Sequence, residues 1–465
     1  MILEGRGGKC RRNQMSGDCD PSQLSAPKSK IREGLHTLTP FSRGQRTGDI
    51  IAASCLLPSA FPGEWRQIKL GWLISVKHGW KFKSEFFMEE GSGKPIVINI
   101  GNFKYNGGFR FNETNVKEYS GEYPAEYEML PGDILLILTC QTEGGEILGI
   151  PGIIPNDGKV YLHNQRLGKI IVKNDSFVDL KFLYWLFLTS NLNQQLVGSA
   201  SGTKIVHTAP SRIENCVIAL PPLPEQKAIA AVLSSLDEKI DLLHRQNKTL
   251  EAMAETLFHH LFIEEAQEDW TEGTLGDEFD FTMGQSPSSS SFNEEGIGVP
   301  MFQGNADFGF RFPKERVYTT KPKKFAKQFD TLISVRASVG AQNMAYKECC
   351  IGRGVAAFKY KKNIHFYTYT YFKLRSFMKE IKKFNDEGTV FGSISKLDFE
   401  VLSVTIPPNE LIEKYEQEAS PVNNKVIANC EQIQTLEKLR DALLPKLMSG
   451  EVRVAFDGGI NMEAA

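Results

Sequence analysis

The sequence lacks the residue patterns on which metal centres, nucleotide hydrolysis and covalent catalysis usually depend. Its 8 cysteines and 8 histidines form no CxxC pair and no zinc-ligand spacing, so we interpret the cysteines as reduced cytosolic thiols. No Gly-x-x-x-x-Gly-Lys-Ser/Thr loop is present, which argues against a P-loop nucleotide site. No serine, cysteine or histidine stands in a recognisable nucleophile motif. We therefore expect no metal, no cofactor and no catalytic centre in this chain.

Long apolar runs are also absent. The most apolar segment, Phe177–Leu188, is interrupted by Asp179 and Lys181 and is typical of an amphipathic core helix rather than a membrane span. The run Ile50–Leu57 is short and lies too far along the chain for a signal peptide. We expect a cytoplasmic protein that makes no contact with a membrane.

The net charge of −2 gives no global sign of a nucleic-acid partner, but the charges are unevenly distributed. Arg311–Lys327 carries seven basic residues and one acidic residue, and Lys359–Lys383 carries eight basic residues and one acidic residue. Leu223–Glu268 instead carries nine acidic and four basic residues. This pattern suits domains that bind a polyanion and are joined by an acidic helix. The alternative is that each run is only a solvated face.

What the sequence does contain is an internal repeat. Pro221-Pro222 recurs 186 positions later as Pro407-Pro408, and a second shared segment begins at Trp65 in one copy and at Trp270 in the other. The pattern indicates two copies of one unit, each a mixed α/β domain followed by a long helix, and a duplicated unit usually meets a duplicated target. We predict an α+β fold with a disordered extension (1–60), a first mixed domain (65–222), a central helix (223–268), a second mixed domain (269–408), a C-terminal helix (409–454) and a tail (455–465).

Both long helices carry a seam with spacings that alternate between 4 and 3 residues, as in a coiled coil. The first seam consists of Ile229, Leu233, Leu236, Ile240, Leu243, Asn247, Leu250, Ala254, Leu257 and Leu261. The second consists of Tyr415, Ala419, Val422, Val426, Asn429, Ile433, Leu436, Arg440, Leu443 and Leu447. The second seam is the weaker one, and we expect Pro421 to kink or restart its helix.

An antiparallel pairing with full overlap brings the polar seam residues together. The facing pairs are then Ile229 with Leu447, Leu261 with Tyr415, and Asn247 with Asn429. Two buried asparagines that meet can bond each other and disfavour other registers, whereas one that faces leucine or isoleucine is costly. We predict an intramolecular antiparallel coiled coil with Asn247 and Asn429 as its register lock. The alternative is that each asparagine only tolerates a partly hydrated seam.

The geometry of such a pair suggests a ruler for DNA. A helix of about 33 residues is about 50 Å long, which corresponds to roughly 14 base pairs of duplex. An antiparallel pair places one mixed domain at each end, related by a pseudo-two-fold axis, as two half-sites on DNA would require.

Four segments resemble the specificity subunits of type I restriction–modification systems. They are Leu220-Pro-Pro-Leu-Pro-Glu-Gln226, Leu443-Leu-Pro-Lys-Leu-Met-Ser-Gly-Glu451, Gly132-Asp133-Ile-Leu and Ser334-Val-Arg336-Ala-Ser-Val-Gly340. The resemblance covers about residues 65–454 and extends to the duplicated architecture. It implies two target-recognition domains that each read half of a bipartite double-stranded DNA site. It also implies helices that set the spacer and dock two modification subunits, with restriction/translocase subunits joining later. In such systems the methyl donor and ATP bind to those other subunits.

Candidate DNA contacts are polar or basic residues in the loops that the resemblance indicates, because these side chains bind base edges and phosphates. In the first domain they are Lys81, Lys83, Asn102, Lys104, Arg110, Thr203 and Lys204. In the second they are Gln303, Asn305, Arg311, Lys323, Lys324, Arg336, Ser338, Thr389, Ser393 and Lys396. Phe103, Tyr105 and Phe308 are candidates for stacking or wedging. For each residue the alternative is an ordinary surface, turn or core position.

Two other classes of function stay open at this point. One is a self-contained DNA-cleaving or DNA-modifying enzyme with an unrecognised site, although the chain has no Asn/Asp-Pro-Pro-Tyr/Phe segment. The other is a coiled-coil scaffold that does not bind DNA. Metal-dependent cleavage by the isolated chain distinguishes the first from a recognition subunit, and a lack of salt-dependent duplex binding identifies the second.

Overall fold

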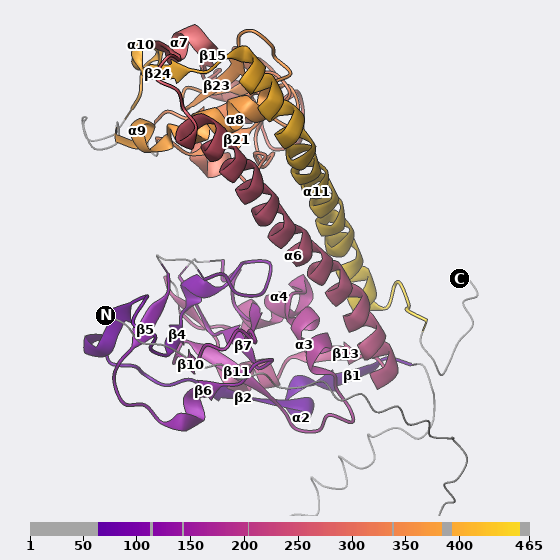
Figure 1. Ribbon diagram of the computed structural model, residues 1–465. Coiled ribbons are helices and arrows are strands. Elements are labelled where there is room, and N and C mark those ends of the chain that lie inside the picture. The colour runs from indigo at the N-terminus through magenta and orange to yellow at the C-terminus, as the bar shows by residue number, and fades with distance from the viewer. Residues whose placement is uncertain are drawn as a thin grey trace, which may run out of the picture. The chain divides into compact units, whose positions relative to one another are not determined.

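The computed structural model describes residues 64–455 except 112–114, 142–143, 203, 337–338 and 384–392 (Figure 1). The extension predicted over residues 1–60 lies outside the described residues. No helix in the described ranges is long and apolar enough to cross a membrane.

The first repeat, Arg66–Leu220, contains two larger sheets. One has the order β2 (Ile74–His78), β11 (Leu167–Val172), β7 (Ile134–Ile137) and β9 (Pro151–Ile153). The other has the order β3 (Phe87–Glu89), β5 (Lys117–Tyr119), β4 (Ile96–Ile98), β10 (Tyr161–His163) and β6 (Glu128–Met129). Two small pairs complete it, β1 (Arg66–Lys69) with β13 (Val217–Leu220) and β8 (Thr139–Cys140) with β12 (Val206–His207). Its helices are α2 (Leu70–Leu73), α3 (Leu180–Phe187), α4 (Ser190–Ser199) and α5 (Pro210–Glu214).

The second repeat, Thr271–Ile406, contains sheets of the same sizes. One has the order β15 (Phe279–Met283), β23 (Val355–Tyr360), β20 (Thr331–Ser334) and β21 (Gln342–Met344). The other has the order β16 (Phe292–Asn293), β18 (Tyr318–Thr319), β17 (Val299–Phe302), β22 (Cys349–Ile351) and β19 (Phe325–Ala326). The closing pair is β14 (Thr271–Thr274) with β24 (Ser403–Ile406). Its helices are α7 (Leu275–Glu278), α8 (Tyr367–Ser376), α9 (Met378–Lys383) and α10 (Lys396–Val401).

The repeat of the sequence is matched by a repeat of topology. Each strand of the two larger sheets in the first repeat has one counterpart in the second repeat, in the same chain order, from β2 with β15 to β11 with β23. The strand β8 belongs to a small pair and is not part of this correspondence. Each five-stranded sheet contains one parallel pair at the same place, β4 with β10 and β17 with β22. The shared segments begin at Trp65 and Trp270, one residue before β1 and β14, and each of these strands pairs with the last strand of its own repeat.

The predicted helix at Phe177–Leu188 is α3, and it is more deeply buried than an amphipathic helix would be. All residues from Phe182 to Phe187 are buried. They pack in one core with Ile229 and Leu233, which belong to the helix α6 (Leu223–His259) that follows the first repeat. The charged residues that interrupt the apolar run lie at its start, where the Asp179 side chain caps α3 by accepting from Phe182 N.

The two long helices are α6, which continues as a π-helical turn η4 (His260–Glu264), and α11 (Asn409–Ser449). The helix α11 continues through Pro421 and Pro445, so Pro421 does not restart it, and the kink that was also expected there stays a prediction. Proline removes one backbone hydrogen bond, but the neighbouring Ala419 and Val426 are fully buried in the core of the second repeat. This packing holds the helix together, because tertiary contacts contribute most of a helix's stability in proteins.

The helices α6 and α11 lie side by side along much of their lengths (Figure 1). Arg440 Nη1 donates to Asp237 Oδ1 at 2.6 Å, Asn429 Nδ2 to Asn247 Oδ1 at 2.9 Å, and Tyr415 Oη to Ala254 O at 3.1 Å. Along this series the residue number on α6 rises from 237 to 254, while the residue number of its partner on α11 falls from 440 to 415. The two helices therefore run in opposite directions. Ile229 and Leu447 share one core, and Leu261 and Tyr415 share the other.

A buried side chain near the start of each long helix fastens it to its own repeat. Gln226 accepts from Asp179 N at 2.9 Å and donates to Phe177 O at 3.0 Å and to Pro221 O at 2.8 Å. Glu416 accepts from Tyr369 N at 2.8 Å and from Thr368 N at 3.3 Å, at the start of α8. In both repeats a side chain of the long helix thus accepts hydrogen bonds from backbone N–H groups at the N-terminus of the neighbouring helix, where these groups lack partners within their own helix.

Candidate nucleic-acid interface

Matching short turns follow β4 and β17, and they position the loops that sequence analysis selected. The turns are η2 (Ile100–Asn102) and η6 (Asn305–Asp307). Asn102 Oδ1 accepts from Asn99 N at 2.7 Å, and Asp307 Oδ2 accepts from Gln303 N at 2.7 Å. Asn102 is fully buried and also donates to Asn115 O at 3.0 Å. Its prediction as a DNA contact is therefore wrong, since both ends of its amide are engaged in building the turn.

An aromatic side chain projects from the tight loop that follows each turn. The loops close through Lys104 N to Gly108 O at 2.9 Å and through Gly309 N to Phe312 O at 3.1 Å. Tyr105, in the first loop, is 77% exposed, and Phe310, in the second, is 37% exposed. Exposed aromatic rings on closed, polar-flanked loops are suited to stacking on nucleic-acid bases.

The aromatic residues just before these loops are placed differently. Phe103 is 2% exposed and packs on Phe109 with ring centres 4.7 Å apart. Phe103 is therefore a core residue, which is the alternative that sequence analysis gave for it, and it is not available for stacking. Phe308 is half-buried and packs against a core of the second repeat.

Arg311 is another candidate that proves to be buried. Its side chain is completely buried, its Nη2 donates to Glu251 Oε1 on α6 at 2.6 Å, and its guanidinium lies 3.9 Å from the centre of the Tyr371 ring. The first arginine of the basic run is thus neutralised by the acidic helix. It joins the second repeat to α6 and cannot reach a base edge from this position.

The remaining described candidates are exposed. They are Lys81, Lys83, Lys104, Arg110, Lys204, Gln303, Asn305, Lys323, Lys324, Arg336, Ser393 and Lys396. A β-bridge brings Arg336 and Ser393 together, although Ser393 lies 57 positions after Arg336 in the sequence. Lys396 forms an ion pair with Glu400 at 2.8 Å. Thr203, Ser338 and Thr389 lie outside the described residues.

Comparison of the two repeats adds residues that sequence reasoning missed. Arg110 N donates to Asn102 O at 2.7 Å, and Lys314 N donates to Asp307 O at 2.7 Å, so Arg110 and Lys314 occupy equivalent places. Lys314 is exposed. Lys314 and Phe310 could have been found by aligning Phe103 with Phe308, but these loops differ in length by one residue and share little sequence.

A groove separates the Lys104–Gly108 loop from α6. Its α6 side carries the carboxylates of Asp237, Glu238 and Asp241. The same groove is also lined by the basic residues Lys104, Arg110, Lys181, Lys314 and Arg440, so its charge is mixed. In the described ranges, no group of three or more His, Cys, Asp or Glu side chains could hold a metal ion.

Comparison with known proteins identifies the family. The sequence model of the type I restriction modification DNA specificity domain matches residues 62–252 and again 267–427. The chain belongs to this family. It is 32% identical over 360 residues to the putative type I restriction enzyme MjaX specificity subunit of Methanocaldococcus jannaschii, a match that covers 73% of this chain and 83% of the relative.

Two further comparisons extend this result. The type I restriction enzyme MjaIX specificity subunit of the same organism is 27% identical over 322 residues, which is 63% of this chain and 73% of the relative. The crystal structure of the type I restriction–modification S subunit from M. genitalium matches with a TM-score of 0.56 at 20% identity, over 84% of this chain and 98% of that one. The structural likeness shows a shared fold.

Proposed function

We propose that the chain is the DNA-recognition subunit of a type I restriction–modification complex. Residues 65–222 and 269–408 are its two target-recognition domains, and each reads one half of a bipartite site in double-stranded DNA. Catalysis belongs to the modification and restriction subunits with which the chain assembles. The observation that carries the proposal is the specificity domain that occurs twice, in a family of specificity subunits.

We infer that α6 and α11 form an antiparallel coiled coil that sets the spacer between the half-sites. Opposed contact pairs and the buried hydrogen bond from Asn429 to Asn247 support this arrangement, with the two amides as its register lock. A pseudo-two-fold axis between the repeats would present equivalent loops to two halves of one duplex. The outer faces of the same helices are the proposed docking surface for two modification subunits.

The proposed contacts divide into two kinds. The exposed lysines and Arg110 would bind phosphates and supply affinity that depends on salt. Arg336, Gln303 and Asn305 carry donor groups that can read base edges, and Tyr105 and Phe310 would stack on bases near the two half-sites. The buried Asn102, Arg311 and Phe103 are excluded from the set.

Methylation mapping in cells tests this function. We expect deletion of the chain to abolish methylation at one bipartite adenine motif in the host genome, and re-expression to restore it. Exchange of residues 65–222 for those of a relative should change one half of the motif and leave the other half intact. An unchanged methylome after deletion would overturn the proposal.

Two assays distinguish the alternatives. The isolated chain should bind duplex DNA weakly in a salt-dependent manner, with sequence specificity appearing once modification subunits are added. It should not cleave DNA with any divalent metal. Cleavage by the purified chain would indicate a self-contained enzyme, and a lack of salt-dependent duplex binding would indicate a scaffold.

A further inference from the structure

In the first repeat, a carboxylate and a tryptophan hold an arginine. Arg453, which follows α11, forms an ion pair with Glu225 in the first turn of α6, and its Nη2 donates to Oε2 at 2.8 Å. Trp65 Nε1 donates to the same oxygen at 3.1 Å, and the guanidinium lies 5.9 Å from the centre of the Trp65 ring. The Glu225 side chain is fully buried, so the arginine neutralises a charge that would otherwise be costly to bury.

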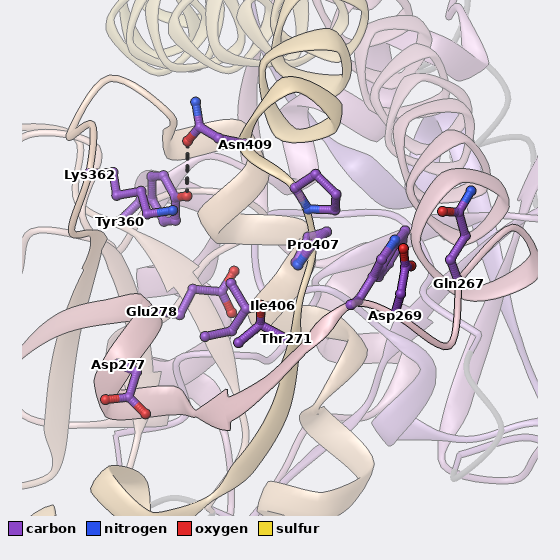
Figure 2. A pocket seen from close by; sticks show the side chains of 12 residues that line it. Gln267, Asp269, Thr271, Asp277, Glu278, Tyr360, Lys362, Ile406, Pro407 and Asn409 are labelled. Atoms are coloured by element: carbon purple, nitrogen blue, oxygen red, sulfur yellow. Dashed lines mark hydrogen bonds between the residues drawn. The ribbon is translucent and has the colours of Figure 1, made fainter.

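The equivalent place in the second repeat has no such arginine. The offset of 186 positions that relates the long helices takes Arg453 to Gln267 and Glu225 to Leu411, while Trp270 takes the place of Trp65. Gln267 and Trp270 line a pocket at the start of α11 (Figure 2). A shorter, neutral side chain thus stands where the first repeat has a guanidinium, and a cavity lies beside it.

This pocket nevertheless contains a buried carboxylate, contributed by Glu278 at the end of α7. The Glu278 side chain is completely buried, and its Oε1 accepts from the Tyr369 hydroxyl. Its Oε2 has no hydrogen-bond donor among the described residues. Lys373 Nζ forms a long ion pair with this oxygen at 4.0 Å, while its hydrogen bond goes to Thr405 O at 2.7 Å.

The lining of the pocket favours a cation. Asp269, Asp277 and Glu278 contribute three carboxyl groups, against the single ammonium group of Lys362. Figure 2 shows Gln267 and Asp269 on one side of Pro407 and Glu278 on the other. A planar cation in this space could donate to Glu278 Oε2 and lie against Trp270, as Arg453 lies against Glu225 and Trp65.

We propose that the pocket between Trp270, Glu278 and the start of α11 binds a guanidinium or primary ammonium group that comes from outside this chain. The group would complete the hydrogen bonding of Glu278 Oε2 as Arg453 does for Glu225. Its source is either a basic side chain of a subunit in the assembly or a small free amine. The site does not depend on DNA recognition, because none of its residues belongs to the proposed DNA contacts.

Titration of the full chain with butylguanidinium tests the site, and butylurea serves as the neutral isostere. We expect saturable binding of butylguanidinium by calorimetry and about tenfold or more weaker binding of butylurea, because a charge-assisted bond to a carboxylate is lost. Glu278→Gln should weaken butylguanidinium binding to a similar degree. Equal binding of both compounds, or no saturable binding of either, would overturn the proposal.

Gln267→Arg provides a second test that does not require removal of a buried group. It introduces an arginine at the position equivalent to Arg453, so it should raise the melting temperature and abolish butylguanidinium binding. Gln328→Arg adds the same charge at an exposed position outside both proposed sites and should leave binding of the probe unchanged. If Gln267→Arg still binds the probe at full strength without added stability, the pocket does not accept a guanidinium.

Assembly with modification subunits distinguishes the two sources. If a subunit side chain fills the pocket, the complex should no longer bind butylguanidinium, and Gln267→Arg should weaken assembly. If the source is a free amine, the complex should bind the probe as the isolated chain does. Both results require probe binding to the isolated chain, and its absence there would refute either version.

Discussion

Replacement of Asn247 by leucine tests the proposed register lock most directly. Asn247 and Asn429 are both fully buried, and Asn429 Nδ2 donates to Asn247 Oδ1 at 2.9 Å. Asn247 Nδ2 has only Cys430 Sγ at 3.4 Å, a weak acceptor, and Asn429 Oδ1 has no partner among the described residues. The hydrogen bond from Asn429 Nδ2 to Asn247 Oδ1 is therefore the main interaction that compensates these two amides for their burial.

The expected magnitude follows from the cost of an unpaired buried amide. Asn247→Leu removes the acceptor and leaves the Asn429 side chain without a good partner, which should lower the free energy of unfolding by about 1–3 kcal/mol. The double variant with Asn429→Leu removes both amides, so it should be more stable than the sum of the single changes predicts, by about 1–2 kcal/mol. The exposed Gln246→Leu is the matched control and should have little effect.

Register needs its own readout. Arg440 Nη1 donates to Asp237 Oδ1 at 2.6 Å, so cysteines placed at both positions should be joined by a short flexible thiol cross-linker in the native register. A slip of one heptad shifts the two positions by about 10 Å along the helices, which should abolish cross-linking by the short reagent. We expect efficient cross-linking with both asparagines present and mixed cross-linking in the double leucine variant.

The alternative of a partly hydrated seam predicts a different pattern. If each asparagine were satisfied by water, the two substitutions would act independently and their effects on the free energy of unfolding would add. Additive effects together with unchanged cross-linking in all variants would refute the register lock.

Four further outcomes are expected. Arg311→Ala should lower the free energy of unfolding by about 1–3 kcal/mol in urea melts, because it removes the buried hydrogen-bond donor of Glu251 and leaves that carboxylate with Arg375 at 3.4 Å, and joint replacement of Arg311 and Glu251 by leucine should recover part of the loss. Tyr105→Ala should weaken DNA binding by the assembled complex by about 1–3 kcal/mol in fluorescence anisotropy without altering the melting temperature; an equal loss on unrelated sequences would support stacking, and no loss would refute it. Burial lowers the pKa of His163 from 6.5 to about 4, so the unfolded chain binds more protons between these values and stability should fall by up to about 3 kcal/mol as the pH drops from 6.5 to 4; His163→Gln should flatten this part of the pH profile. Insertion of one heptad into both long helices should lengthen the spacer by about 10 Å, or roughly three base pairs, in methylation mapping, and an unchanged spacer would contradict the ruler.

Sequence periodicity predicted the elements that depend on local pattern. The helix expected within Phe177–Leu188 is α3, and the long helices expected after each mixed domain are α6 and α11. Apolar runs and heptad spacing are strong local signals for such helices. The continuity of α11 through Pro421 depends on packing against a distant core, which no local pattern records.

The candidate site was harder to predict because exposure depends on tertiary structure. Asn102 and Arg311 have the chemistry of DNA contacts, but one builds a turn and the other is paired with an acidic residue 60 positions earlier. The sequence places Arg311 in a basic run and Glu251 in an acidic one, without indicating that the two meet. Phe310 was missed for the converse reason, since an isolated phenylalanine is normally interpreted as a core residue.

The two repeats are held to each other in two ways, by a covalent link and by packing. The helix α6 connects the repeats covalently, while α11 returns and places Leu447 and Met448 in the core of the first repeat. Beyond them, Arg453 reaches Glu225. A protease nick in the middle of α6 would therefore yield two fragments that stay associated, because the returning helix still spans the break. Separation of the fragments would require extraction of its last turns from that core.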